Sequence, residues 1–187
     1  VFRVEFPLDN CECSEAPRKY GQAFYLNNKT LRYYLDHRFV SNRLSTVRLL
    51  IPDHNRKGGR NKRKNMVTII NVYAPSTSYT SRHGMESLEA FYQDLELTLA
   101  TARRNSGIVF IAGDLNSKLG TLGPQPRYSR TLTKKQEIKR ISHQVAHMGA
   151  YGKGTRNAHG DRLTQFMKSW GLYASNTHFR HPMRHRT

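Results

Sequence analysis

Apolar and polar positions along the first half of the chain alternate in ways that predict strands. Residues 21–26 (GQAFYL) form a short predicted strand, followed by a turn at 27–28. From Phe39 to Ile51 apolar and polar residues mostly alternate, which predicts one strand with a solvated face. Met66 to Tyr73 (MVTIINVY) is β-branched and apolar on both faces. It should therefore be a central strand covered on both sides, ended by the proline that follows.

Spacing of three and four residues predicts two amphipathic helices in the second half of the chain. The segment Glu86 to Arg104 has acidic residues near its start and basic residues at its end, as the helix dipole favours. Its apolar face consists of Leu88, Phe91, Leu95 and Leu99. A second helix is predicted from Arg162 to Trp170, with Asp161 as its N-cap and Gly171 just after its end.

The remaining segments are predicted as strands and connections. Ile108 to Ala112 (IVFIA) should be a second buried strand, and Leu172 to Asn176 another strand. Ser76 to Gly84 is predicted as a polar loop, and Gly113 to Gly154 as a long, weakly patterned loop of a length that is more often functional than idle. Strands that pair locally before helices intervene favour a mixed, largely antiparallel sheet system with helices outside.

Composition adds a strong positive charge to this picture. The chain has 187 residues, 37% of them hydrophobic, which suits one domain with its own core. Its net charge of +18 makes nucleic acid the first candidate partner and an anionic membrane surface the second. A basic loop on a neutral domain explains only six of the eighteen charges. That loop runs from Asp53 to Asn65, has Gly58-Gly59 as a predicted hairpin tip, and carries the candidate phosphate contacts Arg56, Lys57, Arg60, Lys62, Arg63 and Lys64.

The cysteines and chain ends bear on the cellular setting. Cys11 and Cys13 are one residue apart and poorly placed to bridge each other, so a disulfide scaffold is excluded and a reducing compartment fits. No apolar run of membrane-spanning length occurs. We therefore expect an intracellular protein, nuclear or cytoplasmic, without a membrane partner and not secreted. The start at Val1 and the end at Thr187 predict a domain truncated at both ends.

Two strand ends carry the candidate chemistry. Gly113-Asp114-Leu115-Asn116 follows an apolar strand, and its carboxylate and amide, two residues apart in an extended segment, would point to the same side. Asp114 could then accept a proton from water while Asn116 holds that water. Tyr73 ends the earlier strand, where a phenol can donate to a phosphate oxygen. The alternatives are an ordinary Asx turn and an interface tyrosine.

These two strand ends, bracketing one amphipathic helix, resemble the endonuclease/exonuclease/phosphatase superfamily. Within it, the chain is similar to the apurinic-type endonuclease domain of non-long-terminal-repeat retrotransposons. The matching segments are SNRLSTVRLL (41–50), VTIINVYAP (67–75), VFIAGDLNSKLG (109–120) and residues 152–187. The resemblance implies an α/β fold, a four-layered sandwich of two mixed β-sheets flanked by helices. Residues 20–187 would form a partial domain, and residues 1–19 an atypical N-terminal segment.

The resemblance also implies roles for individual residues. Tyr73 matches the tyrosine that contacts the scissile phosphate, Asp114 the aspartate that activates or positions water, and Asn116 its asparagine partner. Intact relatives use Mg²⁺, or Mn²⁺, for which Asp114 and Asn116 are the candidate contacts here. Asn157 is a candidate DNA contact or a helix cap, and we favour the cap. The implied partners are DNA and, in the intact element, a downstream reverse transcriptase, and the chain is expected to be monomeric.

The chain also departs from the family pattern. The family's metal-binding glutamate has no match before residue 20, and the closing aspartate–histidine pair has none before Thr187. We therefore expect a metal-dependent DNA endonuclease domain of retrotransposon origin that is inactive or weak as this fragment. One alternative is a non-catalytic nucleic-acid-binding remnant. Another is a phosphatase of the same fold that acts on a small phosphoester.

Overall fold

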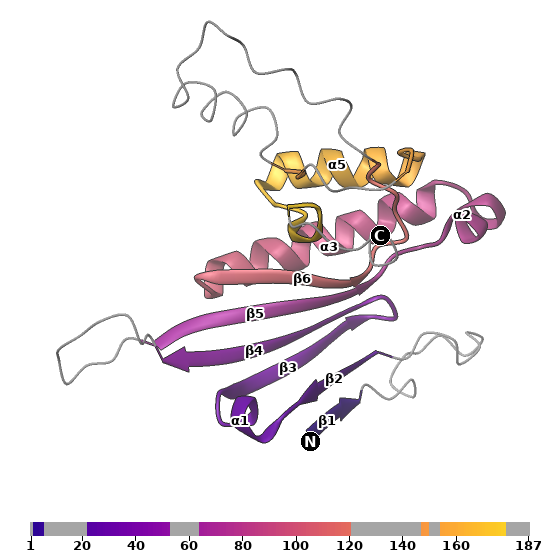
Figure 1. The fold of residues 1–187 in the computed structure, drawn as a ribbon. Helices are drawn as coiled ribbons and strands as arrows, with labels where there is room; N and C mark the ends of the chain where they lie inside the picture. The colour runs from indigo at the N-terminus through magenta and orange to yellow at the C-terminus, as the bar shows by residue number, and fades with distance from the viewer. Residues whose placement is uncertain (1, 6–21, 53–63, 121–146, 150–153, 179–187) are drawn as a thin grey trace, which may run out of the picture. The chain divides into compact units, whose positions relative to one another are not determined.

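A computed structural model describes residues 2–5, 22–52, 64–120, 147–149 and 154–178 of the chain (Figure 1). The chain divides into two compact units, residues 1–115 and residues 116–187. The first unit contains the strands and two of the longer helices, and the second contains helix α5. Each unit is described by itself.

The first unit is built on a four-stranded mixed sheet in the order β3-β4-β5-β6. Its strands are β3 (Tyr34–Ser41), β4 (Leu44–Pro52), β5 (Lys64–Tyr73) and β6 (Ile108–Asp114). β3, β4 and β5 pair antiparallel, whereas β5 and β6 are parallel. A separate antiparallel ribbon pairs β1 (Phe2–Glu5) with β2 (Ala23–Leu26), and the short helix α1 (Asn28–Leu31) follows it.

Opposite faces of the sheet are covered by different elements. On one face, Val47, Leu49 and Val67 form a buried cluster with Leu26 of β2. On the other face, helix α3 (Glu86–Asn105) packs against β5 and β6 (Figure 1). The Thr68 hydroxyl of β5 is 2.5 Å from the hydroxyl of Ser106, just after α3. β5 is therefore the central strand that the sequence predicts, with apolar cover on both faces.

Helix α3 confirms the predicted amphipathic helix almost to its ends. All four predicted core residues are buried, and three further positions join them. Glu86 and Glu89 lie in its first turn and Arg103 and Arg104 in its last, so the charges complement the helix dipole. The buried side chains of α3 are those of Leu88, Phe91, Tyr92, Leu95, Thr98, Leu99 and Ala102.

β6 differs from the buried strand predicted over Ile108 to Ala112. It is one of the two edge strands of the sheet among the described residues. Val109 and Ile111 are half-buried, but Ile108 is 44% exposed and Phe110 is 57% exposed. The prediction was wrong because an apolar run does not reveal whether both faces of its strand are covered.

The described part of the second unit contains helix α5 (Ala158–Trp170) and a 3₁₀ turn, η2 (Ser175–Thr177). Gly171 ends α5 in the left-handed conformation with φ of 58°, as its predicted position after the helix requires. The predicted N-cap Asp161 is wrong, because Asn157 caps the helix four residues earlier. The predicted strand over Leu172 to Asn176 is also wrong, since only Ala174 makes an isolated bridge, to Met148, before η2 begins.

Three further expectations in the first unit need correction. The single strand predicted from Phe39 to Ile51 is two strands, β3 and β4, joined by a tight turn at Asn42 and Arg43. The predicted turn at 27–28 is the start of α1, with Asn27 as N-cap. The predicted polar loop from Ser76 to Gly84 contains a helix, α2 (Thr77–His83), capped by the Ser76 side chain. Each of these short elements is fixed by side-chain caps or strand pairing and has too few residues to show a period.

The α/β class and the mixed sheet are confirmed. The second sheet is a two-stranded antiparallel ribbon in the described residues, so the four-layered sandwich of two mixed sheets stays a prediction. β1 lies within the segment predicted to be atypical. The predicted hairpin tip at Gly58-Gly59 and most of the long loop lie outside the described residues. None of the described helices is long and apolar enough to cross a membrane.

Candidate active site

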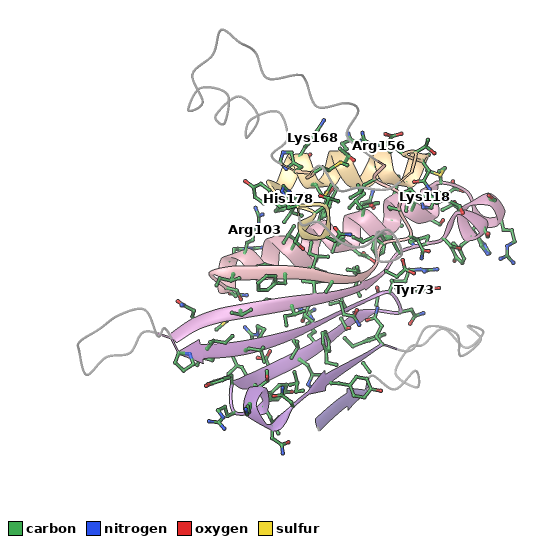
Figure 2. All side chains as sticks on the ribbon, in the orientation of Figure 1. Tyr73, Arg103, Lys118, Arg156, Lys168 and His178 are labelled. Carbon is green, nitrogen blue, oxygen red and sulfur yellow. The ribbon has the colours of Figure 1, made fainter. Side chains whose placement is uncertain are left out.

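The structure brings Tyr73 and Asp114 together. They are paired residues at the ends of the parallel strands β5 and β6, and neighbouring strands lie about 4.8 Å apart. The main-chain N–H of Ala74 donates to the Asp114 carbonyl at 2.8 Å, which extends the pairing by one residue. Paired residues of adjacent strands point to the same face, and both side chains are exposed, with Tyr73 at 38% (Figure 2). A phenol and a carboxylate therefore share one edge of the sheet.

Gly113 makes this arrangement possible. Its φ of 128° is a conformation that L side chains rarely adopt. A Cβ atom there would also lie 2.1 Å from the main-chain oxygen of Val72, the paired residue on β5. Only glycine allows β5 and β6 to approach this closely just before Asp114.

Arg43, in the turn between β3 and β4, lies against Tyr73. Its carbonyl accepts from the Tyr73 N–H at 2.9 Å, and its guanidinium Nη1 donates to the Tyr73 carbonyl at 3.2 Å. Its Cζ atom is 5.7 Å from the centre of the Tyr73 ring. Nothing in the sequence distinguishes Arg43 among the 31 lysine and arginine residues.

Polar residues continue behind Tyr73 on the same sheet face. Asn71 lies two residues before Tyr73 on β5 and is paired with Ser45 of β4. The Ser45 hydroxyl and the Asn42 side-chain oxygen are buried without a hydrogen-bond partner among the described residues. Buried polar atoms of this kind are uncommon in folded proteins and accompany functional sites.

Asn116 is not in the extended segment that the sequence predicts. β6 ends at Asp114, and Asn116 has a φ of 46°, the left-handed conformation that asparagine tolerates better than most residues. It begins the second compact unit. Asn116 therefore lies beyond the regular strand, and the expectation that the Asp114 and Asn116 side chains point to one side stays a prediction.

Asn157 serves as a cap, as favoured from the sequence. Its side-chain oxygen accepts from the Gly160 N–H at 2.9 Å and from the Lys118 N–H at 3.0 Å. It thus ties the segment after β6 to the start of α5, and the Arg156 Nε adds a bond to the Leu119 carbonyl at 3.0 Å. Its expected DNA contact stays a prediction.

Of the candidate phosphate contacts in the basic run, one lies within the described residues. Arg56, Lys57, Arg60, Lys62 and Arg63 are outside the described residues, and Lys64 opens β5. Tyr73 closes the same strand nine residues later. At about 3.3 Å per residue, the start of β5 is about 30 Å from its end.

Few side chains at the ends of β5 and β6 could bind a metal ion. Asp114 is the one carboxylate of the Tyr73–Asp114 pair, and no group of three His, Cys, Asp or Glu side chains gathers within the part of the chain that the structure describes. Mg²⁺ takes one or two carboxylates together with waters and substrate phosphates. These residues alone do not make a magnesium site.

Comparison with known proteins gives one partial likeness. No family model matches the chain, and no solved structure matches it. Over 118 residues, 63% of this chain, it is 32% identical to Craniofacial development protein 2 of Bos taurus. The chain spans 16% of the length of that relative. The likeness agrees with a fold of the endonuclease/exonuclease/phosphatase kind, and it carries no statement about an activity or a retrotransposon origin.

Proposed function

We propose that this chain is part of a metal-dependent phosphodiesterase of the endonuclease/exonuclease/phosphatase superfamily that acts on DNA. The observation that supports this most directly is the pairing of Tyr73 with Asp114 at the ends of two parallel strands. The likeness of residues 152–187 to retrotransposon endonuclease domains adds a retrotransposon origin to the proposal.

The two side chains suit different parts of phosphodiester hydrolysis. The Asp114 carboxylate accepts a proton from the attacking water or orients that water. The Tyr73 hydroxyl donates a hydrogen bond to a non-bridging phosphate oxygen, where negative charge must be balanced in the transition state. Mg²⁺ or Mn²⁺, when bound, would supply further charge stabilisation.

The 187-residue chain should hydrolyse DNA slowly or not at all. It has no counterpart of the family's metal-binding glutamate or of its aspartate–histidine pair. Removing a single group that stabilises transition-state charge typically lowers kcat by about 100- to 1,000-fold. Without both the glutamate and the aspartate–histidine pair, Tyr73 and Asp114 should support only a small fraction of the hydrolysis rate of an intact relative.

Plasmid nicking in the presence of Mg²⁺ tests the proposal. Any slow nicking by the wild-type chain should fall further in Asp114→Asn and Tyr73→Phe. Asp94→Asn, an exposed carboxylate on α3, is the matched control and should change nothing. Nicking that survives Asp114→Asn would remove Asp114 from the site. Rapid nicking that Asp114→Asn abolishes would show that the chain needs no further carboxylate.

A non-catalytic DNA-binding remnant is the second candidate, favoured by the charge of +18. The basic run joins β5 at the opposite end from Tyr73, about 30 Å away, which is the length of about nine base pairs. Replacing its six cations with glutamine should lower the slope of log affinity against log salt by about five. A smaller salt slope in the six-cation variant, together with DNA affinity that Asp114→Asn leaves unchanged, would favour the remnant. DNA binding by the wild-type chain that does not depend on salt would argue against it.

A further inference from the structure

Three elements of the first unit meet at Tyr73. They are the turn between β3 and β4, the end of β5, and helix α2 just beyond Ala74 and Pro75. Arg43 is the residue that touches all three, because it lies in the turn, bonds to Tyr73 and covers a ring of α2. It contributes more contacts to the strand end than a solvated arginine would.

The main chain of Tyr73 is held by Arg43 from both sides. The Tyr73 N–H donates to the Arg43 carbonyl, and the Tyr73 carbonyl accepts from the Arg43 guanidinium. The last regular pair of the β4–β5 ladder is Leu44 with Val72. Arg43 therefore adds one further pair to the ladder, partly through its side chain, at the residue proposed to contact phosphate.

The side chain of Arg43 also lies between two aromatic rings. Its Cζ atom is 4.6 Å from the centre of the Tyr79 ring and 5.7 Å from that of Tyr73, both within the range of a cation–π contact. Tyr79 in turn stacks on His83 with ring centres 4.3 Å apart. The Tyr79 N–H donates to the capping Ser76 hydroxyl at 3.2 Å, which fixes the first turn of α2.

We propose that Arg43 is a positioning residue for Tyr73. Its planar guanidinium bonds to the main chain of Tyr73 and lies over the rings of Tyr73 and Tyr79, which fixes the phenol beside Asp114. This inference rests on the proposed function, in which the Tyr73 hydroxyl contacts phosphate. A lysine would keep the charge but has neither the planar surface nor the fork of donors, so it should not replace Arg43.

A double-mutant cycle with DNA binding tests the proposal in the full chain. Arg43→Lys should weaken binding of a short duplex about two- to fivefold, the size of a partly exposed cation–π contact. In a Tyr73→Phe background the same change should have almost no effect, because the hydroxyl it positions is gone. Arg104→Lys, at an exposed position at the end of α3, should be silent in both backgrounds. Equal effects of Arg43→Lys in both backgrounds, or full binding by Arg43→Lys, would overturn the positioning role.

A second readout needs no DNA. The Nε–H resonance of Arg43 should be shifted by the ring currents of Tyr73 and Tyr79, and this shift should shrink in Tyr79→Leu. A resonance that Tyr79→Leu leaves in place would refute the contact itself. If the shift is present but the wild-type chain binds no DNA, the proposed function fails, and Arg43 is then only a structural bridge.

Discussion

Replacing Gly113 with alanine should destabilise the first unit more than alanine at either of the unit's other described glycines, Gly84 and Gly107. The new Cβ would lie 2.1 Å from the Val72 carbonyl oxygen, and ordinary contacts begin at 3.4 Å. The Val72 oxygen is a backbone atom of the β5–β6 pairing, and the Cβ is attached directly to the backbone of β6, so no flexible side chain can move aside. Full relief of the clash therefore requires the two strands to separate by the difference between 2.1 Å and 3.4 Å, which is 1.3 Å.

The cost has two parts. An alanine held at a φ of 128° adds strain of about 1–3 kcal/mol. Weakening one or two hydrogen bonds of the β5–β6 ladder adds about 0.5–1.5 kcal/mol each. The expected loss is about 1.5–6 kcal/mol, a large share of the stability of about 5–15 kcal/mol that is typical of a domain.

Urea denaturation followed by circular dichroism measures this loss, and Gly107, in the same unit, gives the matched control. Gly107 has open space where its Cβ would be, so Gly107→Ala should be neutral or slightly stabilising. In the second unit, Gly171 has open space but a φ of 58°, so Gly171→Ala should cost that unit about 1–2 kcal/mol from backbone strain alone. If Gly113→Ala unfolds at the same urea concentration as Gly107→Ala, the close strand approach before Asp114 is refuted.

Three further changes probe other parts of the structure. Leu95→Ala empties a fully buried position of α3 and should cost about 2–5 kcal/mol, whereas Leu97→Ala, at a side chain 70% exposed, should cost little, both by thermal denaturation. Asn157→Ala removes the acceptor for two main-chain N–H groups and should cost about 2 kcal/mol, while Asn157→Asp should keep most of that stability. The hydrogen bond from Arg48 lowers the pKa of Asp36 below its ordinary value of 3.8. The pair is half-buried and should contribute less than about 1 kcal/mol, present above pH 3.8 and lost as the pH falls through the lowered pKa. Urea denaturation should therefore find Asp36→Asn less stable than wild type at pH 7 and equally stable in strong acid.

The elements that the sequence predicts well are those whose burial repeats over many residues. Helix α3 spans 20 residues and β5 spans 10, so their apolar spacing samples several turns or pairs of positions. The two-residue turn at Asn42 and Arg43 has neither glycine nor proline, and the flanking strands therefore read as one. Helix α2 is short and rich in serine and threonine, and it depends on its cap and on the contact between Tyr79 and Arg43.

In the candidate site, too, residues that belong to a long apolar pattern can be predicted, and residues that act through single contacts cannot. Tyr73 and Asp114 can be found from the sequence because each closes an apolar strand, and their pairing follows once β5 and β6 are parallel neighbours. Arg43 cannot be found in this way, because its role comes from contacts with residues 30 and 36 positions further along the chain. Nothing in the residue type of Asn116 distinguishes an extended strand end from the left-handed conformation that it adopts.

The parallel pairing of β5 with β6 has a consequence for the order of folding. β3 and β4 are joined by a two-residue turn, and the nearest pair of β4 with β5, Pro52 with Lys64, is 12 positions apart. Paired residues of β5 and β6, such as Val67 and Ile108, are 41 positions apart. Loops of that length close late, because their entropy cost precedes the contacts that repay it. We therefore expect Arg43 and Tyr73 to meet early, within the hairpins, and Asp114 to arrive last with β6. Hydrogen exchange should then find the β6 amides less protected than those of β4, and a ligand that joins Tyr73 to Asp114 should slow exchange mainly along β6.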